Sequence, residues 1–167
     1  LLRLRQSCLW QYQKPNKKDQ IYSTKVEFLL QTLEQIIEEG HQAIVFSQFT
    51  TYLDLIQKEV ENKHWSMARI DGSQSTKKRQ KQVELFQEKG HSVFLISLKA
   101  GGVGLNLTAA SYVFIMDPWW NPAVESQAID RAHRIGQKNT LTVYRPIIKD
   151  SIEEKVLLLQ KAKRELF

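Results

Sequence analysis

Short apolar runs alternate with longer stretches of helical periodicity along this chain, and this alternation constrains the fold more than any other feature. Residues 43–46 form a short apolar run with the length of a buried strand, and we predict further strands over residues 65–70, 93–97, 112–116 and 140–147. Strands that alternate with helices favour a parallel sheet with helices on both faces. We therefore predict an α/β fold whose functional loops follow the carboxyl ends of the strands.

Capping signals place the helices between these runs. Thr24 and Glu27 match a capping box, and Gly40 is predicted to end the helix that they begin. An amphipathic helix is expected after residue 50, a basic helix over 75–89 and another helix over about 122–134. Ser151 with Glu154 predicts the start of a closing helix that runs through residue 166.

The first 22 residues differ from the rest. Residues 1–9 are expected to form the helical end of a preceding element, and residues 11–22 a polar linker around Pro15. We accordingly divide the chain into this segment and one domain over 23–167, a length that can bury a substantial core. Because the sequence begins with Leu, we expect it to be part of a longer protein.

Composition restricts the class of partner. The net charge of +6 suits nucleic acid, with lysines and arginines clustered around residues 14–18, 77–81 and 161–164. A single cysteine, Cys8, and histidines without metal-ligand spacing indicate an intracellular protein with no structural metal site. Apolar runs stay far short of the roughly 20 residues that a membrane-spanning helix needs, so no membrane partner is expected.

The segment 127–137, QAIDRAHRIGQ, carries the strongest chemical signal. On a helix, Gln127 and Arg131 share a face, as do Arg131 and Arg134. Neighbouring guanidinium groups repel each other unless an anion lies between them, and their planar forks match phosphate oxygens. A solvated basic helix face is the alternative that this spacing alone leaves open.

Two further segments precede it, ISLKAGGVGLNL at 96–107 and MDPWWNP at 116–122. The glycines of the first do not complete a dinucleotide-binding fingerprint, because Leu107 stands where its last Gly or Ala belongs. In the second, prolines on both sides restrict the backbone around Trp119 and Trp120, and we expect one of these rings to belong to the core.

In this order, the three segments resemble the last motifs of SWI/SNF-type DNA translocases of helicase superfamily two, and the resemblance extends over nearly the whole chain. It implies a RecA-like lobe that faces a first lobe of the same polypeptide, with ATP and Mg²⁺ in the cleft between them. The chain lacks the Gly-x-x-x-x-Gly-Lys-[Ser/Thr] phosphate loop. We therefore expect the first lobe, outside this chain, to hold most of the ATP and the Mg²⁺.

The resemblance also assigns roles to individual residues. Arg131 and Arg134 correspond to arginine fingers, and Gln127 is expected to fix their geometry. Positions near the nucleotide are Gly104 and Asn106. Positions along the path of double-stranded DNA are Ser47, Gly72, Ser97, Lys99 and Trp120.

The sequence thus predicts the second motor lobe of a DNA-dependent ATPase of the remodelling or repair type, inactive without the first lobe. It would work in the nucleus of a eukaryote or at the nucleoid of a bacterium, with a DNA-bound protein as a further target. A RecA-like module that binds nucleic acid without catalysis is the alternative. An RNA helicase lobe fits the fold but not the WWNP and RAHRIGQ segments.

Overall fold

The structure is a computed structural model that describes residues 2–9, 11–12, 21–88, 90–98, 105–133 and 140–165. The helices are α1 (Leu2–Ser7), α2 (Thr24–Glu38), α3 (Thr50–Asn62), α4 (Thr76–Gln87), α5 (Pro122–Asp130) and α6 (Ile152–Glu165). The strands are β1 (Gln11–Tyr12), β2 (Ile21–Tyr22), β3 (Ala43–Ser47), β4 (Met67–Ile70), β5 (Val93–Ser97), β6 (Tyr112–Ile115) and β7 (Thr142–Tyr144).

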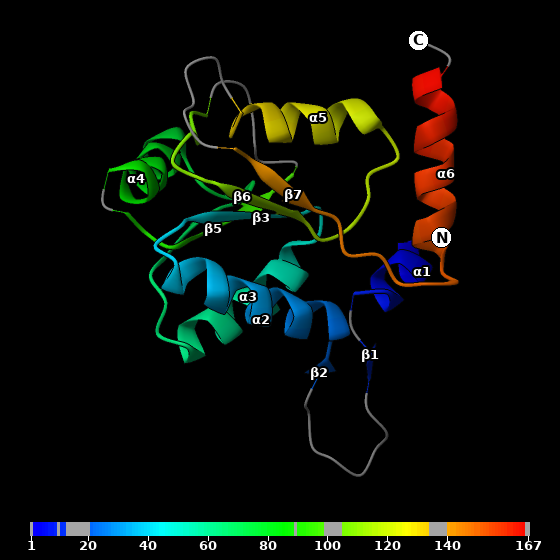
Figure 1. The fold of residues 1–167 in the computed structure, drawn as a ribbon, viewed down its shortest axis with the longest axis horizontal. Helices are drawn as coiled ribbons and strands as arrows, with labels where there is room; N and C mark the ends of the chain where they lie inside the picture. The colour runs from blue at the N-terminus through cyan, green and yellow to red at the C-terminus, as the bar shows by residue number, and fades with distance from the viewer. Residues whose placement is uncertain are drawn as a thin grey trace.

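The main sheet has five strands in the order β4-β5-β3-β6-β7, and every neighbouring pair is parallel. Helices α2 and α3 cover one face, and α4 and α5 cover the other (Figure 1). A parallel sheet with helices on both faces confirms the predicted α/β fold. Because the strands are parallel, each crossover brings the chain back to the end of the sheet where the strands begin. The carboxyl ends of the strands therefore lie together.

Strand β3 divides the hydrophobic core into two layers. Ala43 and Val45 belong to the cluster under α2 and α3, whereas Ile44 and Phe46 belong to the cluster under α4 and α5. Successive strand side chains point to opposite faces, so a fully apolar strand fills both layers. All five residues of β3 are buried. The run that the sequence marks as a strand is thus the centre of the sheet.

Helix α2 differs from its prediction at the start and agrees with it at the end. Its N-cap is Ser23, whose hydroxyl accepts from the N–H of Val26, so Thr24 is the first helical residue and not the cap. At the other end Gly40 has a φ of +78°, and the N–H groups of Gly40 and His41 donate to the carbonyls of Ile37 and Ile36. This Schellman geometry explains the predicted stop at Gly40.

The predicted polar linker is wrong at its two ends. Strands β1 and β2 pair as an antiparallel ladder, Gln11 with Tyr22 and Tyr12 with Ile21. The paired residues are eleven and nine positions apart, and the sequence between the strands, including Pro15, lies outside the described residues. Residues 2–7 do form a helix, as predicted for the first segment.

Two predicted strands are shorter than their apolar runs. Strand β4 begins at Met67 because the N–H of Trp65 still donates to the carbonyl of Val60 at the end of α3. Strand β7 covers only Thr142–Tyr144, where it pairs with β6.

Helix α5 ends four residues earlier than predicted. Its last residue is Asp130, and Arg131 is the C-cap. Beyond it the N–H of Ala132 donates to the carbonyl of Ile129, which tightens the last turn, and the N–H of Leu107 donates to the carbonyl of Arg131 at 3.0 Å. The end of α5 is therefore held by the segment before β6. Arg131 keeps helical φ and ψ, so it still follows Gln127 by four helical positions.

The closing helix α6 packs against α1 and stands beside the sheet (Figure 1). Its start is capped by Ser151, whose hydroxyl accepts from the N–H of Glu153 at 3.1 Å, in agreement with the predicted role of Ser151. The first and last helices of the chain thus lie together at the side where β6 leads into α5.

Candidate functional site

The carboxyl edge of the sheet brings together four of the predicted DNA positions. Ser47 and Ser97 are register partners in β3 and β5. Gly72 follows the end of β4 by two residues, and Trp120 follows the end of β6. Gly72 is exposed, and space around it is open. It lies in a turn where the Asp71 carboxylate accepts from the N–H of Ser73 at 3.0 Å, so Asp71 acts as the predicted turn residue.

Ser47 is fully buried at this edge, and its hydroxyl is occupied within the fold. The hydroxyl donates to Oδ1 of Asp117 at 2.5 Å and accepts from the N–H of Phe49 at 3.1 Å. Asp117 is itself buried, and burial raises its pKa, although the hydrogen bonds from Ser47 and Gln48 act in the opposite direction. Contact between Ser47 and DNA stays a prediction, and its hydroxyl would have to leave Asp117 to make one.

The loop over residues 116–120 is held through its main chain. Lys25 Nζ donates to the carbonyl of Met116 at 2.7 Å, and Arg5 donates to the carbonyl of Pro118 at 2.6 Å. These donors come from α2 and α1. Hydrogen bonds from charged groups are stronger than those between neutral groups, so the loop is fixed from two directions.

Helices α5 and α6 hold the next part of the loop. Glu125 Oε1 accepts from the N–H of Trp119 at 2.7 Å and from Gln160 Nε2 at 2.7 Å. The same Gln160 nitrogen donates to the carbonyl of Trp119, and Lys163 Nζ reaches the carbonyl of Trp120 at 3.4 Å. Glu125 is fully buried, and Arg145 pairs with its second oxygen at 3.3 Å. Main-chain groups of four residues in this loop therefore bond to polar side chains.

Lys25 is itself paired with Glu153 of α6 in a buried ion pair. The two groups are 2.5 Å apart, and each side chain is 2% exposed. Burial lowers the pKa of Lys25, and the carboxylate of Glu153 opposes that shift. The second oxygen of Glu153 accepts from the N–H of Ile148 at 3.0 Å. Such a pair stabilises geometry only as long as both partners are present.

Trp119 and Trp120 have different neighbours. Trp119 packs against the core cluster under α4 and α5, in line with the prediction that one of the two rings belongs to the core. Trp120 is also partly buried, with the guanidinium carbon of Arg5 5.6 Å from its ring centroid. A role of Trp120 in DNA contact stays a prediction.

The predicted nucleotide position Asn106 lies toward the other end of α5. The hydrogen bond from Leu107 to Arg131 puts Asn106 next to the end of this helix. Asn106 and Gln127 are exposed, and the Asn106 side-chain oxygen accepts from the hydroxyl of Thr108 at 3.1 Å. Nine helical residues separate Asn121 from Arg131, so the two lie about 15 Å apart along the axis.

Arg131 is half-buried, and burial lowers the pKa of its guanidinium. It forms no ion pair with any residue that the structure describes. A partly desolvated cation without a carboxylate can receive an external anion at little additional cost. The predicted residues Lys99, Gly104 and Arg134 lie outside the described residues.

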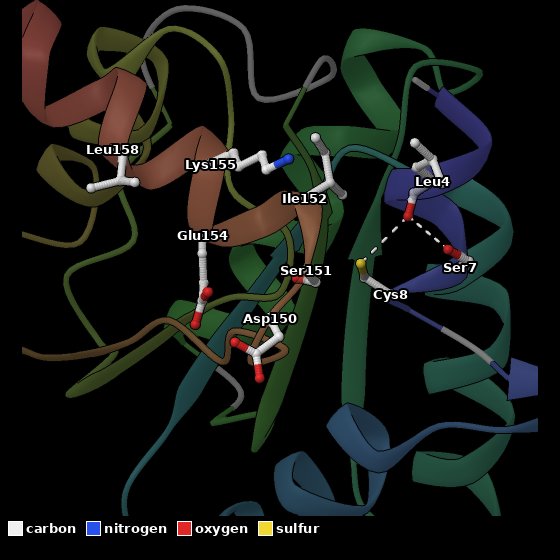
Figure 2. A pocket seen from close by; sticks show the side chains of 9 residues that line it. All are labelled: Leu4, Ser7, Cys8, Asp150, Ser151, Ile152, Glu154, Lys155 and Leu158. Atoms are coloured by element: carbon white, nitrogen blue, oxygen red, sulfur yellow. Dashed lines mark hydrogen bonds between the residues drawn. The ribbon is translucent and has the colours of Figure 1, made fainter.

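A cavity of about 670 Å³ lies elsewhere, between α1 and the start of α6. Figure 2 shows Cys8 and Ser7 on one side of it, both donating to the carbonyl of Leu4, and Lys155 and Leu158 on the other. None of the predicted site residues lines this cavity. A nucleotide site that needs a second lobe would not form a closed pocket in this chain.

A comparison with protein families identifies the domain. The model of the helicase conserved C-terminal domain matches residues 24–136. The chain belongs to this helicase family. Within the family it is similar in sequence to SWI/SNF-type proteins named for DNA repair, so the resemblance seen in the motifs is confirmed.

Three relatives and one solved structure illustrate the match. This helicase domain is 51% identical to the DNA repair protein RAD5B of Arabidopsis thaliana, with 86% of the chain and 12% of the relative covered. It is 47% identical to RAD5 of Saccharomyces cerevisiae, with 86% and 13% covered. It is also 47% identical to the DNA excision repair protein ERCC-6-like of Mus musculus, with 86% and 12% covered. The chain thus spans about an eighth of these relatives.

The C-terminal part of the Fun30 ATPase domain has the same fold, with a TM-score of 0.77 and 36% sequence identity. The alignment covers 83% of this helicase domain and 45% of the Fun30 chain. Together with the parallel sheet, this likeness confirms the RecA-like architecture.

Within the described ranges, no three His, Cys, Asp or Glu side chains gather in a way that could hold a metal ion. Among the helices that the structure describes, none combines the length and apolar character needed to cross a bilayer.

Sequence reasoning missed the residues that hold the 116–120 loop: Arg5, Lys25, Glu125, Glu153 and Gln160. Lys25 and Glu125 each stand near the start of a helix, where a charged residue usually faces solvent. A faint signal existed, since the hydrophobic periodicity of α2 places Lys25 beside the buried Val26 and one turn before Leu29.

Proposed function

We propose that this domain is the second motor lobe of a DNA-dependent ATPase that translocates along double-stranded DNA. Arg131 and Arg134 act as arginine fingers on ATP, and the first lobe of the same polypeptide holds most of the nucleotide and its Mg²⁺. The observation that carries the proposal is the half-buried guanidinium of Arg131, which has no carboxylate partner in the described part of the chain.

The chemistry of the residues is consistent with this role. A planar guanidinium binds phosphoryl oxygens through paired N–H groups and neutralises charge that develops as the terminal phosphoryl group is transferred. Gln127, four helical positions earlier, is available to fix the position of the phosphate. Asn106 and Gly104 approach the nucleotide from the adjoining segment. ATP with Mg²⁺ supplies the phosphoryl group, and this domain supplies positive charge.

The DNA path in this proposal runs along the carboxyl edge of the sheet, past Ser47, Gly72, Ser97, Lys99 and Trp120. Small residues and main-chain N–H groups at strand ends suit the sugar-phosphate backbone, which carries no sequence information. Helix α5 connects the two parts of the site directly, because it begins after Trp120 and its C-cap is Arg131. Closure of the two lobes would then change the DNA grip and the catalytic site together.

The relatives' names support a place in DNA repair. A DNA-bound protein as a further target is part of the proposal. In this role the protein would work where its host keeps its DNA. In a eukaryote, that place is the nucleus. This chain corresponds to about an eighth of the length of these relatives. A role of the whole protein would therefore also depend on parts outside this chain.

The test uses the full-length protein with Arg131→Ala and, separately, Arg134→Ala. We expect the turnover number of DNA-stimulated ATP hydrolysis to fall about 10³- to 10⁵-fold, the range known for arginine fingers. Affinity for DNA should change little. Lys99→Ala is the contrasting variant and should weaken DNA stimulation first. Near-parental turnover with lost DNA binding in both arginine variants would place these arginines on the DNA path instead.

A further inference from the structure

Arg5 is a buried cation that neither the helicase motifs nor the proposed catalytic residues include. It lies on α1 and is 6% exposed, while Arg3 and Leu4 on the same helix are exposed. Its guanidinium donates to the carbonyl of Pro118 at 2.6 Å, across 113 residues of sequence. Burial of a guanidinium is costly unless its N–H groups find acceptors. The contacts that offset this cost for Arg5, on a short helix, therefore indicate what the residue does.

The guanidinium of Arg5 also lies between two aromatic side chains. Its Cζ atom is 5.6 Å from the ring centroid of Trp120 and 5.9 Å from that of Phe49. Both distances are within the range of a cation–π contact. Phe49 follows β3 and donates its N–H to Ser47, and Trp120 follows β6. Arg5 thus connects the two loops whose residues are predicted to face DNA.

The contact of Arg5 is directional and not only electrostatic. Arg5 forms no ion pair within the described ranges, although the charges of Asp117 and Glu153 attract it. Its contacts are one carbonyl and two ring faces, and these require a planar fork of defined orientation. A lysine would keep the charge at this place but has no planar guanidinium to contact the carbonyl and both rings together.

We infer that Arg5 is a positioning residue for Trp120: through Pro118 and the two rings, it holds the Trp120 side chain in the orientation that grips DNA. The inference rests on the proposed function, because it takes Trp120 as a DNA contact. It adds that the N-terminal helix α1 is part of the DNA-gripping device. Loss of Arg5 should therefore weaken the grip without removing a group that touches DNA.

The experiment measures ATP hydrolysis by the full-length protein against the concentration of duplex DNA. In Arg5→Gln, the DNA concentration for half-maximal stimulation should rise about three- to thirty-fold, the range of a cation–π contact with a desolvated cation. Turnover at saturating DNA should stay within about twofold of the parent, because this is a binding defect. Arg5→Lys should give a smaller rise. Arg3→Gln, an exposed arginine of the same helix, is the matched control and should give none.

Trp120→Ala and the double variant Arg5→Gln/Trp120→Ala complete a cycle. If Arg5 acts through Trp120, the double variant should be no worse than Trp120→Ala alone. Two outcomes would overturn the inference and leave the proposed DNA path intact. In the first, the rises in half-maximal DNA concentration of the two single variants multiply in the double variant. In the second, Arg5→Gln and Arg5→Lys keep the parental DNA dependence while Trp120→Ala is impaired. A Trp120→Ala variant with parental DNA dependence would overturn the DNA contact and the positioning role with it. Should Arg5→Gln fail to fold, as judged by thermal melting, the same cycle with Arg5→Lys decides.

Discussion

The two ends of α5 are built in opposite ways. Before its first turn, the 116–120 loop is bonded through its main chain to side chains from α1, α2, α5 and α6. After its last turn, Arg131 is half-buried and has no carboxylate partner among the described residues. The polar groups of the loop find partners within this chain, whereas the described residues provide no anion for the cation at the other end.

The two ends of α5 therefore suit two different functions. A loop that must grip a polymer repeatedly benefits from a fixed shape, and satisfied buried polar groups provide one. A residue that must meet a reacting phosphate benefits from remaining unpaired until the phosphate arrives, at some cost in stability. The comparison predicts that stability depends strongly on the polar side chains around the loop and hardly at all on Arg131.

The largest effect is expected at the buried pair beneath the loop. Lys25→Met keeps the apolar stem but leaves Glu153 as an unpaired buried charge and the Met116 carbonyl without its donor. We expect the free energy of unfolding to fall by about 3–5 kcal/mol. Urea unfolding of the 167-residue chain, followed by circular dichroism, measures it. The control is Lys63→Met, since Lys63 pairs with Glu34 at 3.1 Å on the surface and should matter by less than about 1 kcal/mol.

The double variant Lys25→Met/Glu153→Leu sharpens the same prediction. Removal of both charges should recover part of the lost stability, because no unpaired carboxylate remains. Recovery should be incomplete, since the N–H of Ile148 also donates to Glu153. Equal losses for Lys25→Met and Lys63→Met would show that the loop does not depend on the buried pair.

A second, smaller effect is expected where α6 reaches the loop. Gln160→Leu removes the donor that serves both the Glu125 carboxylate and the Trp119 carbonyl. A hydrogen bond to a charged group contributes about 1.5–3 kcal/mol, and the free energy of unfolding should fall by this amount. The measurement is again urea unfolding. Lys161→Leu, at an exposed neighbouring position, should leave the unfolding midpoint nearly unchanged, and a similar loss in both variants would argue against a role for the hydrogen bonds.

Asp117 provides a test through pH. Burial raises its pKa above the ordinary value of 3.8, so between 3.8 and the raised value the folded chain keeps a proton that the unfolded chain has lost. The stability that this group contributes is complete below 3.8 and is lost as pH rises through the folded pKa. Asp117→Asn has no such dependence. Its free energy of unfolding relative to the parent should therefore rise between pH 4 and neutrality, and a fall over that range would contradict the assignment.

The sequence was sufficient for the sheet and for the motif segments, because both depend on local pattern. The fully apolar runs of β3 and β5 could hardly be anything other than central strands, and Gly40 marked the end of α2 correctly. The pairing of β1 with β2 and the early end of α5 were missed. In the second case the deciding contact, from Leu107 to the carbonyl of Arg131, joins segments that are 24 positions apart.

The loop-holding residues were missed for a similar reason. Arg5 and Lys25 donate to carbonyl oxygens at 118 and 116, and any residue type provides a carbonyl. No spacing or complementary residue in the sequence announces such a contact. The motif residues could be proposed from the sequence because their chemistry is carried by side-chain identity, and their roles stay predictions. The residues that hold the loop act on the main chain and appear only in the folded structure.

The smallest effect is expected at Arg131, and it tests the comparison most directly. Arg131→Met keeps an apolar stem and removes a guanidinium whose pKa burial already lowers. No carboxylate that the structure describes is left unpaired by this change, so the free energy of unfolding should stay within about 0.5 kcal/mol of the parent or rise slightly. Urea unfolding under the conditions used for Lys25→Met measures it, and the same substitution in the full-length protein should abolish DNA-stimulated ATP hydrolysis. A variant that keeps stability and loses turnover is what an unpaired finger predicts. If Arg131→Met instead unfolds as readily as Lys25→Met, Arg131 has a structural partner, and the two ends of α5 are alike after all.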